Sequence, residues 1–499
     1  MRVSKGTNLW QARRGYALDA RVELPDVGRL TSMPAPALAG LAERFRAIGL
    51  GPSLRRLVRV GDRLDDALRA PLRVWTARRL RDPAAFAARL FILHDPVTEQ
   101  EATAALGDLR PLRDGGLVED VAAGLTSRLH LAVAGDLYLL GDLPGLGGDA
   151  VMPICGATME LVRATLPAAA VGSVLDLGCG GAPVGLLLAR AARRVVATDV
   201  NPRALAFARV NAALNGVTNV ELRLGDLYET VRGERFDRIA AHPPFVARPA
   251  GARASTFVHG GARGDELPLR VLAGAAEHLT PGGRAVVLGD WPVVDGDPLD
   301  ARVRAAVGPG AADVLVLESP PKNLDEYCAL HTAVEHRELG EAFAQAAIAH
   351  RDHLETLRLR GLALACVVVA PGNGWTSHLP VRHVSDVPIT AESVDRMLAA
   401  RRLAFSGDEA IATAKLRLPE GARLVEQPMP GGAPPSAIVQ LPTGRPEWPV
   451  VLDAASAAWL ARIASAGSVR DAARGTPAEE PAAVGAARDA LLRGALDVA

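Results

Sequence analysis

The chain has 499 residues, more than one ordinary domain holds, so we expect a catalytic domain with attachments. Hydrophobic residues make up 49%, yet the longest apolar runs, such as 362–370, fall short of the roughly 20 residues that cross a bilayer, which excludes membrane-spanning classes and a membrane partner. The net charge is zero, but residues 1–90 carry 18 basic and 8 acidic side chains. A nucleic-acid-facing arm fits this asymmetry. So does a compositional bias, because 53 of the 56 basic residues are arginine.

Cysteines and the first residues indicate a cellular compartment. The four cysteines lack the spacing of a disulfide framework or a zinc site, and residues 1–16 lack the apolar core of a secretory signal. We therefore expect a cytoplasmic protein without a bound metal.

The first 82 or so residues are predicted to be helical. Apolar residues recur at helical spacing over 36–48 and 54–74, and we assign 1–82 to an N-terminal helical region. Over 83–148 three short helices precede short strand-like stretches, with Thr98 and Glu101 spaced as a capping box. This order predicts a winged-helix-like domain, which either binds nucleic acid or only packs against its neighbour.

Beyond the glycine-rich run 141–148 the chain alternates strand and helix. Seven short β-rich runs are separated mostly by stretches rich in Ala, Leu and Arg, which is the rhythm of a doubly wound α/β domain over 149–372. The predicted strands are 174–177, 194–198, 220–224, 236–240, 285–288, 314–318 and 362–370. The C-terminal extension 373–499 is predicted to be irregular apart from a helix at 454–464.

A glycine turn follows the first of these strands. In VLDLGCGGAPVGLLLA, Gly178 and Gly180 form a tight turn that lets the backbone approach a ligand, and a helix begins directly afterwards with free N–H groups. Asp176 lies at the end of the strand itself. Such a turn is a weak signal alone, since dehydrogenases use one too.

Three features at the ends of the next strands strengthen the signal. Asp199 lies 19 residues after Gly180, where a carboxylate can accept both hydroxyls of a ribose, and Asp226 can accept the exocyclic amine of an adenine. The fourth strand ends in AHPPFV, where Pro243 and the following proline lock the backbone and aim a carbonyl and the Phe245 ring into the crevice.

These motifs resemble the class I S-adenosylmethionine-dependent methyltransferases, in the branch with an Asn-Pro-Pro-Tyr type motif. That branch includes release-factor glutamine methyltransferases and guanine-N2 rRNA methyltransferases, and ATDVNPRALAFARVNAALNG is particularly close to it. The resemblance covers about 150–372 and implies a Rossmann-like seven-stranded domain with S-adenosylmethionine as cofactor. It implies that Asp176, Gly178 and Gly180 surround the methionine end, Asp199 the ribose and Asp226 the adenine.

Two positions depart from the family pattern. Ala182 stands at the third glycine position, and His242 stands where relatives have Asn or Asp. In the family, the Asn oxygen and the adjacent proline carbonyl accept two hydrogen bonds from an acceptor NH2. A neutral imidazole accepts one such bond and can also take a proton. His242, Pro243 and Phe245 are therefore the candidate catalytic residues.

The expected function is methyl transfer to a nitrogen, an amide or exocyclic amine, of a protein, an RNA or a specialised metabolite. Two alternatives stay open: O-methylation with His242 as general base, and a catalytically silent scaffold that binds the cofactor. A nicotinamide-linked oxidoreductase is disfavoured because the HPPF motif has no role in hydride transfer. The loop 255–265 could form part of a lid, and Trp291 could border the acceptor pocket or belong to the core.

Overall fold

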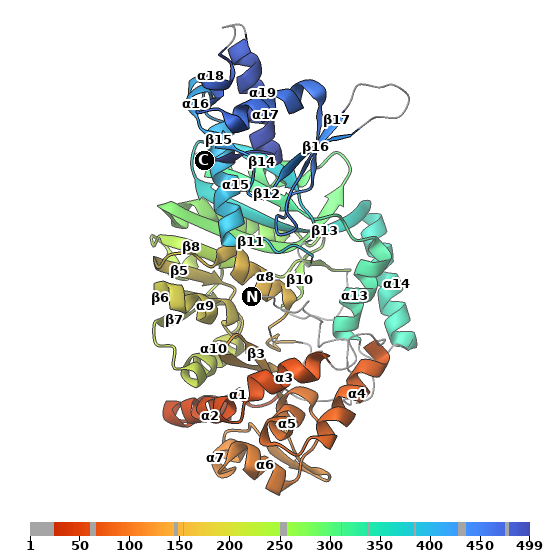
Figure 1. Cartoon of the computed structure of the whole chain (residues 1–499). Coiled ribbons are helices and arrows are strands. Elements are labelled where there is room, and N and C mark those ends of the chain that lie inside the picture. Colours follow the sequence, from red (N-terminus) through yellow and green to blue (C-terminus); the bar gives the residue numbers. More distant parts are fainter. Residues whose placement is uncertain are drawn as a thin grey trace.

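The protein is described here by a computed structural model. It describes residues 24–59, 66–143, 148–152, 154–249, 257–310, 312–336, 340–383, 386–427, 436–474 and 479–499. Residues 1–23 and 60–65 of the predicted helical region, 144–147 of the predicted boundary and the first residues of the predicted lid lie outside this set. Figure 1 shows the N-terminal part at one end of a central sheet and the C-terminal part at the other.

A large sheet forms the centre of the molecule (Figure 1). Its order is β14-β12-β13-β11-β8-β5-β6-β7, with β13 antiparallel to both of its neighbours and every other described pair parallel. All seven predicted strands occur in it, which confirms the Rossmann-like seven-stranded domain. The strands are β5 Val171–Leu177, β6 Ala192–Asp199, β7 Val220–Leu224, β8 Phe236–Ala241, β11 Leu279–Val294, β12 Ala312–Glu318, β13 Leu359–Pro371 and β14 Thr376–Pro380.

The eighth strand was not predicted. β14 pairs parallel with β12 beyond the predicted boundary at 372, so the sheet continues to Pro380. Its sequence, TSHLP, is short, alternates buried and exposed residues and ends in proline, which a sheet tolerates at an edge strand.

Helices cover both faces of the sheet. On one face, an apolar cluster joins α8, α9 and the C-terminal helix α15 (Ala391–Ala404) to Val174, Ala240 and Val286. On the opposite face, a second cluster joins α11 and α12 to Leu175 and Ala241, because side chains alternate along each strand. The helices of this domain are α8 Gly156–Thr165, α9 Pro183–Leu188, α10 Pro202–Asn215, α11 Glu266–Ala275, α12 Leu299–Val307, α13 Leu324–Glu335 and α14 Glu341–Thr356.

The two predicted N-terminal units share one core. A single apolar cluster runs from Leu30 through Phe45, Phe91 and Tyr138 to Phe207 of α10. The Thr98–Glu101 capping box is confirmed: each side chain accepts a hydrogen bond from the other residue's backbone N–H, at 3.2 and 3.0 Å. The elements are α1 Val27–Thr31, α2 Ala35–Ala47, α3 Leu50–Arg59, α4 Asp66–Arg79, α5 Pro83–Ala88, a π-helical turn Arg89–Leu93, α6 Glu99–Leu106, α7 Arg110–Asp114, β1 Glu119–Val121, β2 Gly124–Thr126, β3 Leu129–Ala134 and β4 Leu137–Asp142.

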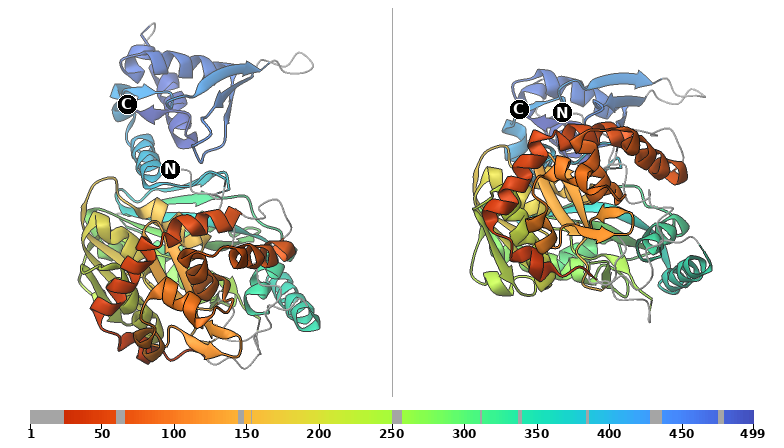
Figure 2. Two further views of the ribbon diagram at one scale, coloured as in Figure 1. Left: turned by 60° about the horizontal axis from the view of Figure 1, so that its bottom comes forward. Right: turned by 90° about the horizontal axis from the view of Figure 1, so that it is seen from below.

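The prediction of an irregular C-terminal extension is wrong. Its helices and a three-stranded sheet, β16-β17-β18, enclose a core of their own (Figure 2). Many members of that core are alanines, which give little contrast in a hydrophobicity pattern. The predicted helix at 454–464 is confirmed. The elements are α15 Ala391–Ala404, α16 Asp408–Thr413, β15 Leu416–Arg417, β16 Arg423–Gln427, β17 Ser436–Gln440, β18 Val450–Asp453, α17 Ala454–Ser465, α18 Val469–Ala472, α19 Glu480–Arg493 and β19 Asp497–Val498.

Candidate functional site

The glycine turn after β5 adopts the conformation that its sequence indicates. Gly178 and Gly180 have φ of 71° and 55°, in the left-handed region that favours glycine. Apart from its chain neighbours, a methyl group added at Gly178 would meet no atom of the described residues within 4 Å, so this side of the turn is open to a ligand. Ala182 also lies in this region, at φ 57°, and directly precedes α9. The departure from glycine therefore places a mildly strained residue in a buried position.

Asp176, near the end of β5, forms a buried hydrogen bond behind the turn. It is 2% exposed, and its Oδ2 accepts a hydrogen bond of 2.7 Å from the N–H of Gly185 in α9. Burial raises the pKa of this carboxyl to about 7, despite the opposing hydrogen bond. Asp176 thus ties the strand end to the helix start behind the turn.

Asp199 holds the same turn from the next strand. Its Oδ2 accepts a bond of 2.8 Å from the N–H of Gly180, and its Oδ1 accepts one of 2.8 Å from Asn201. Burial raises the pKa of Asp199, and these backbone bonds oppose the shift. Because a carboxylate offers about four lone-pair sites, two remain for ribose hydroxyls.

Asp226 is more exposed than the other two. Its side chain is 45% exposed and forms an ion pair of 2.9 Å with Arg270 of α11. One carboxylate oxygen is engaged in this pair, and the other can still accept a bond from an adenine amine. The predicted cofactor residues therefore lie along the carboxyl ends of β5, β6 and β7, where α/β domains bind ligands.

The candidate acceptor motif directly follows β8. The rings of His242 and Phe245 meet edge to face, with centroids 5.3 Å apart, and both residues are half-buried. Nε2 of His242 is buried and has no hydrogen-bond partner among the residues that the structure describes. Burial lowers the pKa of His242, and the charge of Asp290 opposes the shift, so the ring is neutral at physiological pH.

Sequence reasoning missed three residues beside this motif. Asp290 of β11 is 3% exposed, Lys322 lies 3.0 Å from one of its oxygens, and His331 of α13 lies 3.6 Å from the same oxygen. The sequence does contain an indication of Asp290, because this carboxylate follows a predicted buried strand, as Asp199 does. Trp291 belongs to the core on the α11–α12 side of the sheet, which favours the prediction of a core residue over that of a residue bordering the acceptor pocket.

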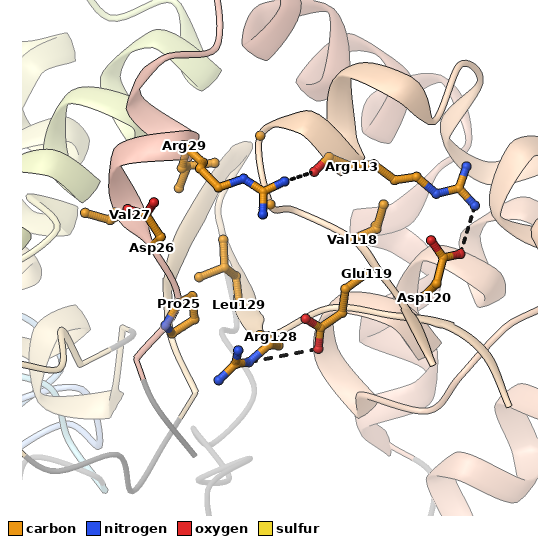
Figure 3. Close-up of a pocket in the computed structure, with 13 residues that line it drawn as sticks. Pro25, Asp26, Val27, Arg29, Arg113, Val118, Glu119, Asp120, Arg128 and Leu129 are labelled. Carbon is orange, nitrogen blue, oxygen red and sulfur yellow. Dashed lines mark hydrogen bonds and ion pairs between the residues drawn. The ribbon is translucent and has the colours of Figure 1, made fainter. Parts of the chain in front are cut away.

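A separate pocket lies in the N-terminal part (Figure 3). It holds about 290 Å³ between α1, α7 and β1. Arg29 donates a bond to the carbonyl of Arg113, whose guanidinium pairs with Asp120 at 3.0 Å. Arg128 lies 3.9 Å from Glu119. Because three carboxylates, Asp26, Glu119 and Asp120, line the pocket together with three arginines, the pocket has no excess charge with which to hold an anion.

Strand order, glycine turn and strand-end carboxylates together define a doubly wound domain that binds a nucleoside-bearing cofactor. A family model described as methyltransferase small domain matches residues 157–290. The release factor glutamine methyltransferase of Cereibacter sphaeroides is 32% identical over 238 residues, 45% of this chain and 84% of the relative. The chain belongs to this family of class I S-adenosylmethionine-dependent methyltransferases.

Other relatives are matched over shorter stretches. A release factor glutamine methyltransferase of Xylella fastidiosa is 37% identical over 129 residues, 24% of this chain. Here the chain spans 46% of the relative, about half its length. The ribosomal RNA small subunit methyltransferase C of Aeromonas hydrophila is 38% identical over 90 residues, 18% of this chain and 25% of the relative. In the part of the chain that the structure describes, no helix is long and apolar enough to span a membrane.

Proposed function

We propose that the protein transfers a methyl group from S-adenosylmethionine to a nitrogen, an amide or exocyclic amine, of a macromolecule. The observation that carries the proposal is the unpartnered Nε2 of a neutral His242 beside Phe245, next to a glycine turn clamped by Asp199. The relatives named for protein glutamine and for ribosomal RNA support a macromolecular nitrogen acceptor.

The residues fit the cofactor in three ways. The turn is open at Gly178, Asp199 keeps lone pairs for a ribose, and Asp226 keeps an oxygen for an adenine amine. When bound, the cofactor supplies a methyl group already activated by a sulfonium. The chain then has to align the acceptor and exclude water.

In this proposal His242 and the Pro243 carbonyl accept hydrogen bonds from the acceptor NH2, and Phe245 packs against its plane. A neutral imidazole with a free Nε2 can accept one of these bonds. O-methylation would instead require His242 to take a proton in the rate-limiting step, and a lowered pKa makes it a weaker base for that purpose.

The proposal is tested in two stages. Calorimetry with S-adenosylhomocysteine measures cofactor binding. Purified protein is then incubated with methyl-labelled S-adenosylmethionine and an extract from a strain that lacks the gene, and the product is treated with protease or ribonuclease. Label that either enzyme releases supports a macromolecular acceptor, and label that base releases as methanol marks an ester and refutes nitrogen transfer. Cofactor binding without any transfer would favour the scaffold alternative.

A further inference from the structure

Asp290 lies on the face of the sheet that carries Asp176, close enough to act on His242. Ala240 of β8 lies opposite Asp176 of β5 and opposite Val286 of β11. Side chains alternate along strands, so Asp290, four positions after Val286 in β11, shares the face of Asp176. His242 directly follows β8, and the charge of Asp290 acts on its ring. The candidate acceptor motif therefore has a buried carboxylate beside it, one strand further along.

Asp290 is held as an anion. Burial raises the pKa of its carboxyl, but the nearby His331 side chain and the charge of Lys322 outweigh burial, and the pKa lies below its usual range. Lys322 Nζ lies 3.0 and 3.3 Å from the two oxygens. The His331 contact, at 3.6 Å, is longer than an ordinary hydrogen bond. The carboxylate thus keeps lone-pair sites for a ligand.

Phe245 connects the two groups. Its ring meets His242 at a centroid distance of 5.3 Å and His331 at 5.8 Å, both edge to face. Among the described residues, Nε2 of His242 is buried without a hydrogen-bond partner, whereas Nε2 of His331 has the 3.6 Å contact with Asp290. A buried polar atom without a partner is rare, and one that lies beside a half-buried ring and an anionic carboxylate indicates a site for a polar ligand.

We propose that Asp290, held by Lys322 and His331, is an acceptor-binding residue that selects a nitrogen acceptor whose NH2 is flanked by a second N–H. The inference rests on the proposed function and deepens it. His242 and the Pro243 carbonyl suffice for the two hydrogens of an NH2, so an anionic oxygen beside them is a third hydrogen-bond acceptor.

The third acceptor distinguishes two kinds of substrate. A ring N–H next to the NH2, as on the edge of a cyclic amidine in a nucleobase, donates to the carboxylate. A primary carboxamide presents its carbonyl oxygen at that position. Two acceptors would then face each other without a proton between them, which a buried site disfavours strongly.

Two analogues of S-adenosylhomocysteine, with nitrogen in place of sulfur, test the proposal by calorimetry. In one, a two-carbon arm ends on the exocyclic nitrogen of isocytosine, which has the neighbouring ring N–H. In the other, the arm ends on the nitrogen of acetamide. We expect the wild-type protein to bind the isocytosine analogue at least about 10-fold more tightly, as one hydrogen bond to a charged group implies. Equal binding, or preference for the acetamide analogue, overturns the proposal.

Asp290→Asn isolates the residue. This near-isosteric change should weaken the isocytosine analogue about 10-fold or more and leave the acetamide analogue and S-adenosylhomocysteine within about twofold. Asp295→Asn is the matched control, because Asp295 directly follows the same strand but is 68% exposed. It should change none of the three affinities. An equal loss for all three ligands in Asp290→Asn refutes a selective role. If that variant folds poorly, equal binding of the two analogues by the wild-type protein still overturns the proposal. Failure of S-adenosylhomocysteine itself to bind the wild-type protein would refute the proposed function instead.

Discussion

Replacement of Asp199 by Ala tests the cofactor site most directly. The carboxylate clamps the N–H groups of Gly180 and Asn201 at 2.8 Å each and keeps two lone-pair sites for a ribose. Loss of charge-assisted ribose bonds should weaken S-adenosylhomocysteine binding by about 1 to 3 kcal/mol. That corresponds to a roughly 5- to 150-fold increase in Kd, measured by calorimetry. Since the variant also releases the turn, its free energy of unfolding should fall.

A matched control separates these two effects. Asp237 also accepts two backbone N–H groups, from Gly172 at 2.7 Å and Ser173 at 3.0 Å, but at the amino end of β8. Asp237→Ala should therefore lose stability and keep the wild-type affinity. An Asp199→Ala protein that is folded and binds S-adenosylhomocysteine as the wild type does would refute the assignment of this motif. Equal loss of affinity in both variants would refute the specific role of Asp199.

Four further predictions concern other parts of the site. Burial raises the pKa of Asp176 from 3.8 to about 7, so between these pH values the folded protein binds a proton that the unfolded chain releases. The free energy of unfolding should therefore fall as pH rises from about 4 to about 7, by up to about 4 kcal/mol. Asp176→Asn should remove this fall, so the difference in Tm between the variant and the wild type should be more favourable to the variant at pH 8 than at pH 5. The rate should fall only at pH below 6.5, because the pKa of His242 is lowered and the protonated ring accepts no bond; His242→Asn should stay active, and less than about a hundredth of the wild-type rate would exclude an orienting role. Asn211 accepts a hydrogen bond from Leu140 and donates one to Gly181 in the glycine turn, so Asn211→Ala should lower the free energy of unfolding by about 1 to 3 kcal/mol and weaken S-adenosylhomocysteine binding. The amide of Asn219 donates hydrogen bonds to the carbonyls of Ala189 and Ala192 instead, so Asn219→Ala should affect stability alone. Cofactor binding and methyl transfer should persist in EDTA, and activity lost there and restored by a divalent ion would contradict a metal-free mechanism.

The sheet could be predicted because its central strands contain short apolar runs. The run 285–288, AVVL, has no polar position, and the turns between the strands carry the glycines and carboxylates. The strand-end rule also located Asp199 and Asp226 at the carboxyl edge. The same rule applies to Asp290, but no family motif covers that position, and its partners Lys322 and His331 come from a later segment that sequence spacing does not bring near.

The features of the fold that the sequence did not predict depend on packing between segments that lie far apart in the chain. The shared N-terminal core joins residues such as Leu30 and Phe207 that lie far apart in the chain, and a boundary near 82 therefore separates parts that fold together. The C-terminal unit packs small side chains, for which helical periodicity is weak. β14 lies at the edge of the sheet, where propensity decides less than the pairing with β12.

Two asparagines of α10 join the N-terminal part to the cofactor turn. Asn215 bonds the backbone of Tyr138 at 2.9 and 2.7 Å, and Asn211 bonds the N–H and carbonyl of Leu140 at 2.7 and 3.0 Å. The amide of Asn211 also donates to the carbonyl of Gly181 at 3.0 Å. These two amides bond the backbone N–H and carbonyl groups of β4, which would otherwise pair with a neighbouring strand. A truncated protein that begins near residue 149 would lose the hydrogen bonds of both amides to β4 and would expose the apolar face of α10 around Phe207. The methyltransferase domain is therefore not expected to keep its stability without its N-terminal partner.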